Sequence, residues 1–272
     1  MSDILLKGQG LTRRWGGLVA VNDVSLTLAR GEVHAVIGTN GAGKSTLINL
    51  LSGEIAPSAG TVELLGRDIT GWSQPRRARG GLGRSYQRNT VYPAFTVFEN
   101  CRLAAQARSQ QPWHWWQDAQ RCEASCSAAR DAAQRAGLDD VLSRPAGLLS
   151  HGQKRQLEIA MCLATGPQVL LLDEPLAGMG AEETERMLAL LADLKGPAGG
   201  KPPPPPGAEA AGVPPSAAST GHAILLVEHD MDAVFRIADT ITVMVNGAVI
   251  ASGKPDFVRN SHEVQAAYLG GH

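Results

Sequence analysis

The stretch Gly38-Thr39-Asn40-Gly41-Ala42-Gly43-Lys44-Ser45-Thr46 lies between an apolar run ending at Ile37 and a second apolar run beginning at Leu47. It matches the pattern G-x-x-x-x-G-K-[ST] between a predicted strand and a predicted helix. Glycines let successive backbone N–H groups point at phosphate oxygens, and the helix N-terminus adds partial positive charge. Lys44 supplies a full charge at the outer phosphates, and the Ser45 hydroxyl can ligate Mg²⁺. We therefore predict a phosphate-binding loop here, with a structural glycine-rich turn as the alternative.

A pair of carboxylates follows a second apolar run, Val169-Leu170-Leu171-Leu172. A continuous apolar run of this kind is typical of a strand buried on both faces of a parallel sheet. Asp173 and Glu174 would then lie at the carboxyl edge of the sheet, where open α/β folds bind ligands. We expect Asp173 to hold Mg²⁺ through a water and Glu174 to polarise the attacking water as general base.

The rest of the chain alternates strand-like and helix-like patterns. Further runs typical of strands are residues 24–28, 32–37, 61–65, 224–227 and 241–245, whereas residues 100–135 are rich in helix-forming Ala, Gln and Arg. We predict an α/β fold whose core sheet is largely parallel, with a helical block inserted near residues 90–165.

Composition narrows the class of protein. The chain has 272 residues and a formal net charge of -1, which argues against a protein built to coat nucleic acid or an anionic membrane. The N-terminus lacks the pattern of a signal peptide, and no apolar stretch approaches the length of a membrane span. The four cysteines show no C-x-x-C spacing, so we expect buried or half-buried free thiols and a cytoplasmic protein.

Residues 197–220 differ in composition from the rest of the chain and hold 8 of its 16 prolines. Five consecutive prolines can form a polyproline II rod but cannot join a sheet or a helical core. A disordered insertion in a surface loop is the favoured interpretation, with a proline-motif ligand as the alternative.

A third motif, Leu149-Ser150-His151-Gly152-Gln153, precedes a predicted helix. Ser150 and Gln153 have the spacing of a capping box, which fixes a helix start with exposed N–H groups. The chain would thus own two phosphate-binding helix ends. With these residues in view, the chain resembles the ATP-binding subunit of ABC transporters over nearly its whole length. Residues 1–272 would form one ABC ATPase domain with a P-loop NTPase core sheet, an antiparallel N-terminal β-subdomain and an inserted helical subdomain.

The resemblance implies further site residues. It makes Gly38 to Thr46 the Walker A segment, Val169 to Glu174 the Walker B segment, and Leu149 to Gln153 the signature motif. In that family two subunits pair head to tail, so Ser150, Gly152 and Gln153 would contact the γ-phosphate held by the other subunit. The resemblance also assigns Gln87 to the Mg²⁺ and the attacking water, His229 to the γ-phosphate, and Trp15 to adenine; a place in the core is the alternative for Trp15.

Three positions depart from the family pattern: Thr39 stands where the family often has Pro, His151 replaces a common Gly, and Gly180 stands where the family commonly has Asp. The segments 228–235, 249–253 and 266–271 are similar to the branched-chain amino acid importer subfamily. The resemblance implies ATP and Mg²⁺ as cofactors and a second ATPase subunit, homo- or heteromeric, as partner. It also implies transmembrane permeases, a periplasmic solute-binding protein and a place on the inner face of the plasma membrane, and no nucleic acid.

Four alternatives remain. Importers of urea, short-chain amides or other amino acids share nearly all of these features. A soluble ABC ATPase outside transport would share the motifs, although ribosome and repair types usually carry two modules or long coiled coils. A small-molecule kinase would lack residues 149–153, and a non-catalytic nucleotide switch would not need Glu174.

Overall fold

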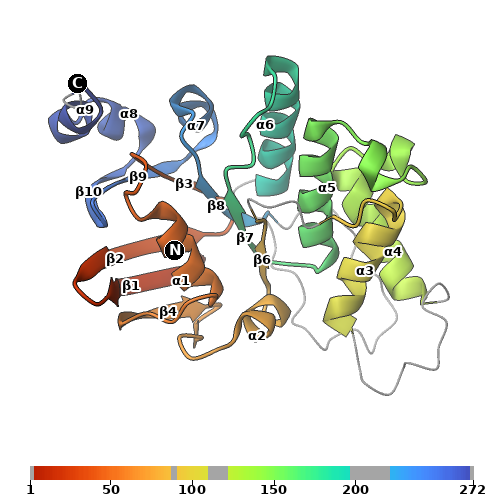
Figure 1. Cartoon of the computed structure of the whole chain (residues 1–272), viewed down its shortest axis with the longest axis horizontal. Helices are drawn as coiled ribbons and strands as arrows, with labels where there is room; N and C mark the ends of the chain where they lie inside the picture. The colour runs from red at the N-terminus through yellow and green to blue at the C-terminus, as the bar shows by residue number, and fades with distance from the viewer. Residues whose placement is uncertain (1–2, 87–90, 110–121, 197–220, 270–272) are drawn as a thin grey trace.

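The computed structural model describes residues 3–86, 91–109, 122–196 and 221–269, which form two sheets flanked by helices (Figure 1). The strands are β1 Ile4–Trp15, β2 Leu18–Ala29, β3 Val33–Gly38, β4 Ala59–Leu64, β5 Arg67–Asp68, β6 Leu82–Arg84, β7 Val169–Asp173, β8 Ala223–Val227, β9 Thr240–Val245 and β10 Ala248–Gly253. The α-helices are α1 Lys44–Ser52, α2 Gln74–Arg79, α3 Val97–Ser109, α4 Glu123–Arg135, α5 His151–Ala164, α6 Ala181–Lys195, α7 Met231–Ile237, α8 Pro255–Arg259 and α9 His262–Leu269. Short 3₁₀ turns cover Asp139–Val141 and Ala146–Leu148.

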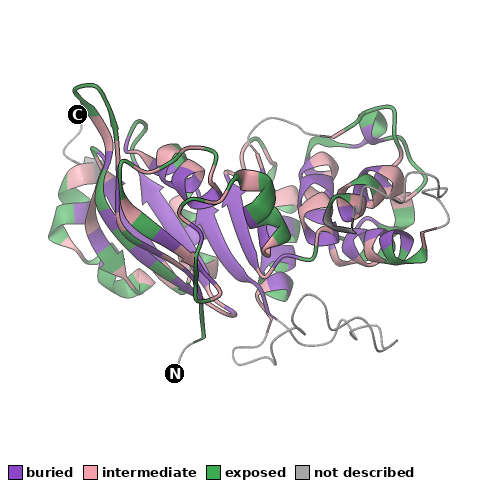
Figure 2. Cartoon of the chain, turned by 90° about the horizontal axis from the view of Figure 1, so that it is seen from below, coloured by how far each residue is buried: buried purple, intermediate pink, exposed green. Residues whose placement is uncertain are grey.

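The larger sheet sets the position of the predicted motifs. Its strand order is β10-β9-β3-β8-β7-β6, and all neighbours are parallel except the antiparallel pair β9–β10. Strands β3, β7 and β8 are buried along their whole length, and Figure 2 shows them inside the molecule. Because parallel strands end at the same edge, the segments that follow β3, β7 and β8 meet there.

One face of this sheet packs against α1 and the smaller sheet. The smaller sheet has the order β2-β1-β4-β5, and its pairs are antiparallel. Leu47 and Leu51 of α1 share a buried cluster with Leu6 of β1 and with Leu171 and Leu225 of the larger sheet. The α1 helix begins directly after the glycine-rich loop. It is therefore packed against both sheets.

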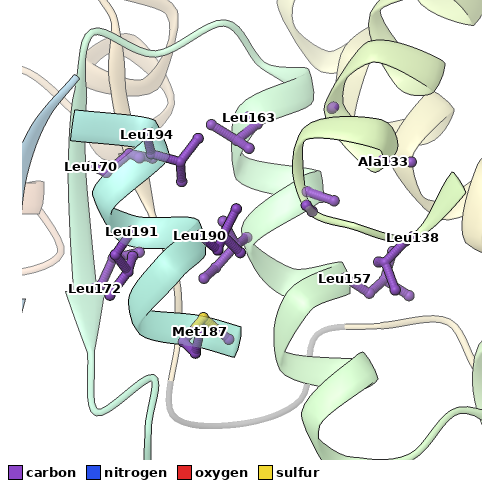
Figure 3. Close-up of a cluster of buried hydrophobic side chains, with 14 of the residues drawn as sticks. Ala133, Leu138, Leu157, Leu163, Leu170, Leu172, Met187, Leu190, Leu191 and Leu194 are labelled. Carbon is purple, nitrogen blue, oxygen red and sulfur yellow. The ribbon is translucent and has the colours of Figure 1, made fainter. Parts of the chain in front are cut away.

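The opposite face packs against α5 and α6. Leu170 and Leu172 of β7 lie in one buried cluster with Leu190 and Leu191 of α6 and Leu157 of α5 (Figure 3). Alternate residues of β7 thus point to opposite clusters, as the two-residue period of a strand requires. Helices α3 and α4 pack in turn on α5 and complete a helical block beside the sheet (Figure 1).

The predicted fold class, α/β with a largely parallel core sheet and an antiparallel N-terminal β-unit, is confirmed. The Leu- and Ala-rich residues 187–194 are part of α6, the helix that joins β7 to β8. The four cysteines are free and buried or half-buried, as expected. Cys122 is the N-cap of α4, and its carbonyl oxygen accepts from the N–H of Cys126 at 3.1 Å, one turn into the helix.

Gln87, the Pro-rich segment 197–220 and the tryptophans at 113–116 lie outside the described residues. Among the residues described, no helix combines the length and the apolar character needed to cross a bilayer.

Candidate functional site

The glycine-rich loop joins the end of β3 to the start of α1. Gly43 is the N-cap of α1 with φ +99°, and a Cβ placed there would lie 2.4 Å from the carbonyl oxygen of Ala20. Only glycine fits this position, because an L side chain would meet both backbone strain and a clash. The other residues assigned to the loop range from buried to exposed: Gly38 and Ala42 are buried, Thr46 is half-buried, and Thr39, Asn40, Gly41 and Ser45 are exposed.

The side chain of Lys44 folds back onto the backbone of this loop. Its side chain is buried, and Nζ donates to the carbonyl oxygens of Gly38 at 2.7 Å and Thr39 at 3.1 Å. Burial lowers the pKa of Lys44, while the nearby carboxylates of Glu174 and Asp173 oppose that shift. The ammonium group therefore sits between the loop backbone and the acidic end of β7.

Asp173 ends β7 and faces this edge. It is 4% exposed, and burial raises the pKa of its carboxyl group, whereas Arg84 and Lys44 act in the opposite direction. Among the described residues, its Oδ1 atom has no hydrogen-bond partner although it is buried. A buried carboxylate oxygen with free lone pairs is suited to a Mg²⁺-bound water, so the residues present fit the predicted metal. Ser45 adds an exposed hydroxyl at the start of α1.

Glu174 lies directly after β7 in a rare backbone conformation. Its φ is +50°, and its N–H donates to the carbonyl oxygen of Val227 at the end of β8 (2.9 Å). The Oε1 atom of Glu174 is 3.9 Å from Nδ1 of His229. The side chain of His229 is 59% exposed, so an imidazole and a carboxylate face solvent together at the sheet edge.

The predicted capping box at the start of α5 is present. Gln153 N–H donates to Ser150 Oγ at 3.2 Å, and Ser150 N–H donates to Gln153 Oε1 at 3.1 Å. Because α5 packs on the sheet face opposite to α1, this helix end lies apart from the glycine-rich loop of the same chain.

Glu183, in the first turn of α6, is bound to this helix end. Its Oε1 accepts from the backbone N–H of Gly152 at 3.2 Å and from Ser150 Oγ at 3.3 Å. A Cβ at position 152 would lie 2.6 Å from the carboxyl carbon of Glu183, so a larger residue there would displace this side chain. The negative carboxylate complements the positive end of the α5 dipole. No sequence pattern pointed to Glu183, because its contact is purely tertiary.

Two of the departures from the family pattern, His151 and Gly180, lie beside this helix end. His151 Nε2 is 3.1 Å from the carbonyl oxygen of Ala177 and donates to it when that nitrogen carries the proton. Gly180 is the N-cap of α6 and offers no side-chain cap. His151 thus connects the motif at residues 149–153 to the turn that follows Glu174.

Trp15, at the end of β1, is 44% exposed. The guanidinium carbon of Arg13 lies 4.9 Å from the centre of its ring. This exposure excludes the alternative of a core tryptophan. The exposed part of the indole is available for stacking.

Sequence reasoning also passed over Glu228, the buried residue directly before His229. An acidic residue at the end of the apolar run 224–227 was a visible signal, since carboxylates are rarely buried without a function or a partner.

Comparison with known proteins adds to this geometry. The family model for ABC transporters matches residues 21–177, and the model for branched-chain amino acid ATP-binding cassette transporters matches residues 248–272. The chain is 36% identical to the high-affinity branched-chain amino acid transport ATP-binding protein BraF of Pseudomonas aeruginosa and 35% identical to LivG of Escherichia coli, with 99% of each chain covered.

Solved structures agree in fold. The ADP conformation of an ATP-binding cassette of an ABC transporter superposes with a TM-score of 0.80 at 27% identity, covering 98% of this chain and 99% of that one. A nucleotide-free ATP-binding cassette gives a TM-score of 0.79 at 26% identity, covering 97% and 98%. The chain belongs to the ABC transporter family, among its branched-chain amino acid transport ATP-binding proteins.

Proposed function

We propose that this chain binds and hydrolyses ATP with Mg²⁺ and so powers an importer of branched-chain amino acids. One observation carries the proposal: the loop holding Lys44, the Asp173–Glu174 pair and His229 all follow buried parallel strands and meet at one sheet edge. The relatives named above supply the solute class.

Each residue has a task in this proposal. The loop N–H groups and Lys44 bind the phosphates, and Trp15 stacks on adenine. Bound Mg²⁺ would neutralise charge on the phosphates, held by Ser45, by Asp173 through a water and by Gln87. Glu174 takes the proton of the attacking water, and His229 contacts the γ-phosphate.

The start of α5 motivates the proposed dimer. Its donors, on Ser150, Gly152 and Gln153, lie on the opposite side of the sheet from α1, so one nucleotide cannot use both helix ends of one chain. Two subunits arranged head to tail would bring this helix end to the partner's ATP. Permeases would hold the dimer on the inner face of the plasma membrane, and a periplasmic binding protein would deliver solute to them. We assign residues 90–165 to the helical subdomain.

The test is to purify the chain with its co-expressed membrane partners, reconstitute the complex in vesicles and measure phosphate release. The binding protein is supplied with leucine, with urea or without solute. We expect stimulation by the leucine-loaded protein and loss of activity in Lys44→Ala, whereas Lys7→Ala, on β1 of the smaller sheet, serves as a control.

Each outcome decides one part of the proposal. Stimulation by urea in place of leucine would overturn the solute class. A chain that captures no permease and whose ATPase answers to no solute would overturn import and favour a soluble ABC ATPase. Normal hydrolysis by Lys44→Ala would overturn the active site itself.

A further inference from the structure

Glu228 is a carboxylate buried at the end of β8, between the two residues proposed to act on the γ-phosphate and the water. It is 1% exposed. Its Oε1 accepts from the backbone N–H of Leu176 at 2.8 Å, and its Oε2 accepts from the N–H of His229 at 3.2 Å. One side chain therefore touches the segment after β7 and the segment after β8.

The contact with Leu176 fixes the turn that carries Glu174. Pro175 has no N–H, so the N–H of Leu176 is the first one available after Glu174. On the other side, Glu174 N–H is held by Val227 at 2.9 Å. A non-glycine residue at φ +50° persists only where its surroundings over-determine the backbone, and these two hydrogen bonds enclose it on both sides.

The contact with His229 fixes the second catalytic segment. Nδ1 of His229 lies 3.9 Å from Oε2 of Glu228 and 3.9 Å from Oε1 of Glu174. Glu228 N–H also points to the carbonyl oxygen of Val36 in β3 at 3.4 Å, which relates this segment to the strand that leads into the glycine-rich loop. Hydrogen bonds to an ionised carboxylate are stronger than neutral ones, which suits a group that must hold two backbones in register.

We propose that Glu228 is a positioning residue for ATP hydrolysis: its carboxylate ties the backbone of the Glu174 turn to that of His229, so that both side chains reach the γ-phosphate and the water together. The inference deepens the proposed function and rests on it. Burial raises the pKa of Glu228, and the two N–H donors oppose that shift. Glu228 itself does not reach the nucleotide, since its two oxygens are turned to the backbone.

The test uses the reconstituted complex with Glu228→Gln and Glu228→Ala. Glutamine keeps one acceptor oxygen for Leu176 but presents an amide N–H₂ to the N–H of His229, whereas alanine leaves both donors without a partner. A displacement of catalytic groups by about 1 Å can cost roughly 100-fold. We expect kcat to fall by about 10- to 100-fold in the alanine variant and by less in the glutamine variant. The Kd for ATP should stay within about twofold, because Lys44 and its loop are untouched.

Glu32 provides a matched control. It is a half-buried carboxylate that, like Glu228, accepts two hydrogen bonds, here from Ala29 N–H and Thr240 Oγ1, each at 2.7 Å. It lies before β3, at the opposite edge of the same sheet. Glu32→Gln and Glu32→Ala should lower the melting temperature without the selective loss of kcat.

A combined variant separates positioning from general support of the fold. If Glu228 acts through Glu174 and His229, adding Glu228→Ala to the Glu174→Gln/His229→Ala variant should change the residual single-turnover rate by less than about twofold. Independent contributions would multiply instead.

The inference is overturned if folded Glu228→Ala hydrolyses ATP at the wild-type rate. It is also overturned if kcat and ATP affinity fall together in the Glu228 variants, or if Glu228→Ala lowers the rate of the Glu174→Gln/His229→Ala variant as much as it lowers that of wild type. If the alanine variant fails to fold, Glu228→Gln decides by the same comparison: a loss of kcat with an unchanged Kd for ATP supports the inference. A wild-type complex without Lys44-dependent hydrolysis would instead overturn the proposed function.

Discussion

At the scale of single residues, burial moves the pKa of several ionisable groups in this chain away from their ordinary values. Lys44 and Asp173 are both buried, and burial lowers the pKa of one and raises that of the other. Such opposed shifts at one site are typical of catalytic centres. His222, buried far from the nucleotide edge at the start of β8, shows the same effect without a catalytic task.

Asp173→Asn should trade activity for stability. The charged carboxylate is disfavoured by burial, so the neutral amide should raise the free energy of unfolding of the nucleotide-free protein by roughly 1 kcal/mol. ATP hydrolysis should be lost, since the amide is a poor partner for a metal-bound water. Thermal unfolding and phosphate release measure both; a less stable, active Asp173→Asn protein would contradict the assignment.

His222→Gln should change the pH dependence of stability. Burial, with Arg135 next, lowers the pKa of His222 from 6.5 to about 4. The unfolded chain therefore binds this proton before the folded one does, and stability falls as pH drops from 6.5 to about 4, by at most about 1.4 kcal/mol per pH unit. Well above pH 6.5 the imidazole is neutral in both the folded and the unfolded state, so its titration no longer changes the free energy of unfolding. Glutamine keeps an acceptor for Arg135, whose Nη2 is 2.7 Å from Nε2 of His222.

Urea unfolding between pH 4 and 8 checks this prediction. Between pH 6.5 and 4, the free energy of unfolding should fall less steeply in the glutamine variant than in wild type. The control His262→Gln, at an exposed position in α9, should follow wild type. Identical acid limbs for wild type and His222→Gln would refute it.

At the scale of elements, the start of α5 is a positive helix end held by a carboxylate from α6. Glu183 takes the N–H of Gly152 and the hydroxyl of Ser150. These are the donors that the dimer model offers to the partner's phosphate. In the proposed dimer, this contact between α5 and α6 would have to open before the partner's phosphate could take these donors.

Glu183→Ala should loosen this contact with two measurable results. Loss of the helix-end interaction should lower the free energy of unfolding by about 1 kcal/mol. In a Glu174→Gln background, the variant should form the ATP-driven dimer at a lower ATP concentration than the parent protein. Sedimentation velocity at increasing ATP concentration measures the fraction of dimer. Glu182→Ala is the matched control, because Glu182 is an exposed residue of the same first turn. Weaker dimerisation of Glu183→Ala would show that the carboxylate supports closure.

The sequence predicted the elements whose signals are local. Buried strands β7 and β8 were visible as continuous apolar runs, and the start of α5 was visible as a capping box, because both depend on neighbours in the chain. The contacts of Glu183 and Glu228 join residues 31 and 52 positions apart, which no local pattern encodes.

At the scale of the whole molecule, the Pro-rich segment 197–220 interrupts the connection between α6 and β8. The residues on both sides of it are adjacent: a Cβ on Gly196 would lie 2.9 Å from Cα of Gly221, and His222 N–H donates to Leu194 at 2.9 Å. The end of α6 and the start of β8 are therefore already in contact without the help of this segment.

Replacing residues 197–220 with a four-residue Gly/Ser linker should preserve the enzyme. ATPase activity should stay within about twofold, and the shorter loop should raise the free energy of unfolding by up to roughly 1.5 kcal/mol. Phosphate release and thermal unfolding of the shortened chain measure this. A large loss of activity in a folded, shortened chain would assign the segment a role beyond that of a spacer.

We propose that Glu174, directly after β7, activates water for ATP hydrolysis in this subunit. The most direct measurement is single-turnover phosphate release by the reconstituted complex, wild type against Glu174→Gln, with ATP binding measured in parallel. We predict that the variant binds ATP as tightly as wild type, accumulates as an ATP-bound dimer and releases phosphate at least about 100-fold more slowly. Phosphate release at the wild-type rate would contradict the account.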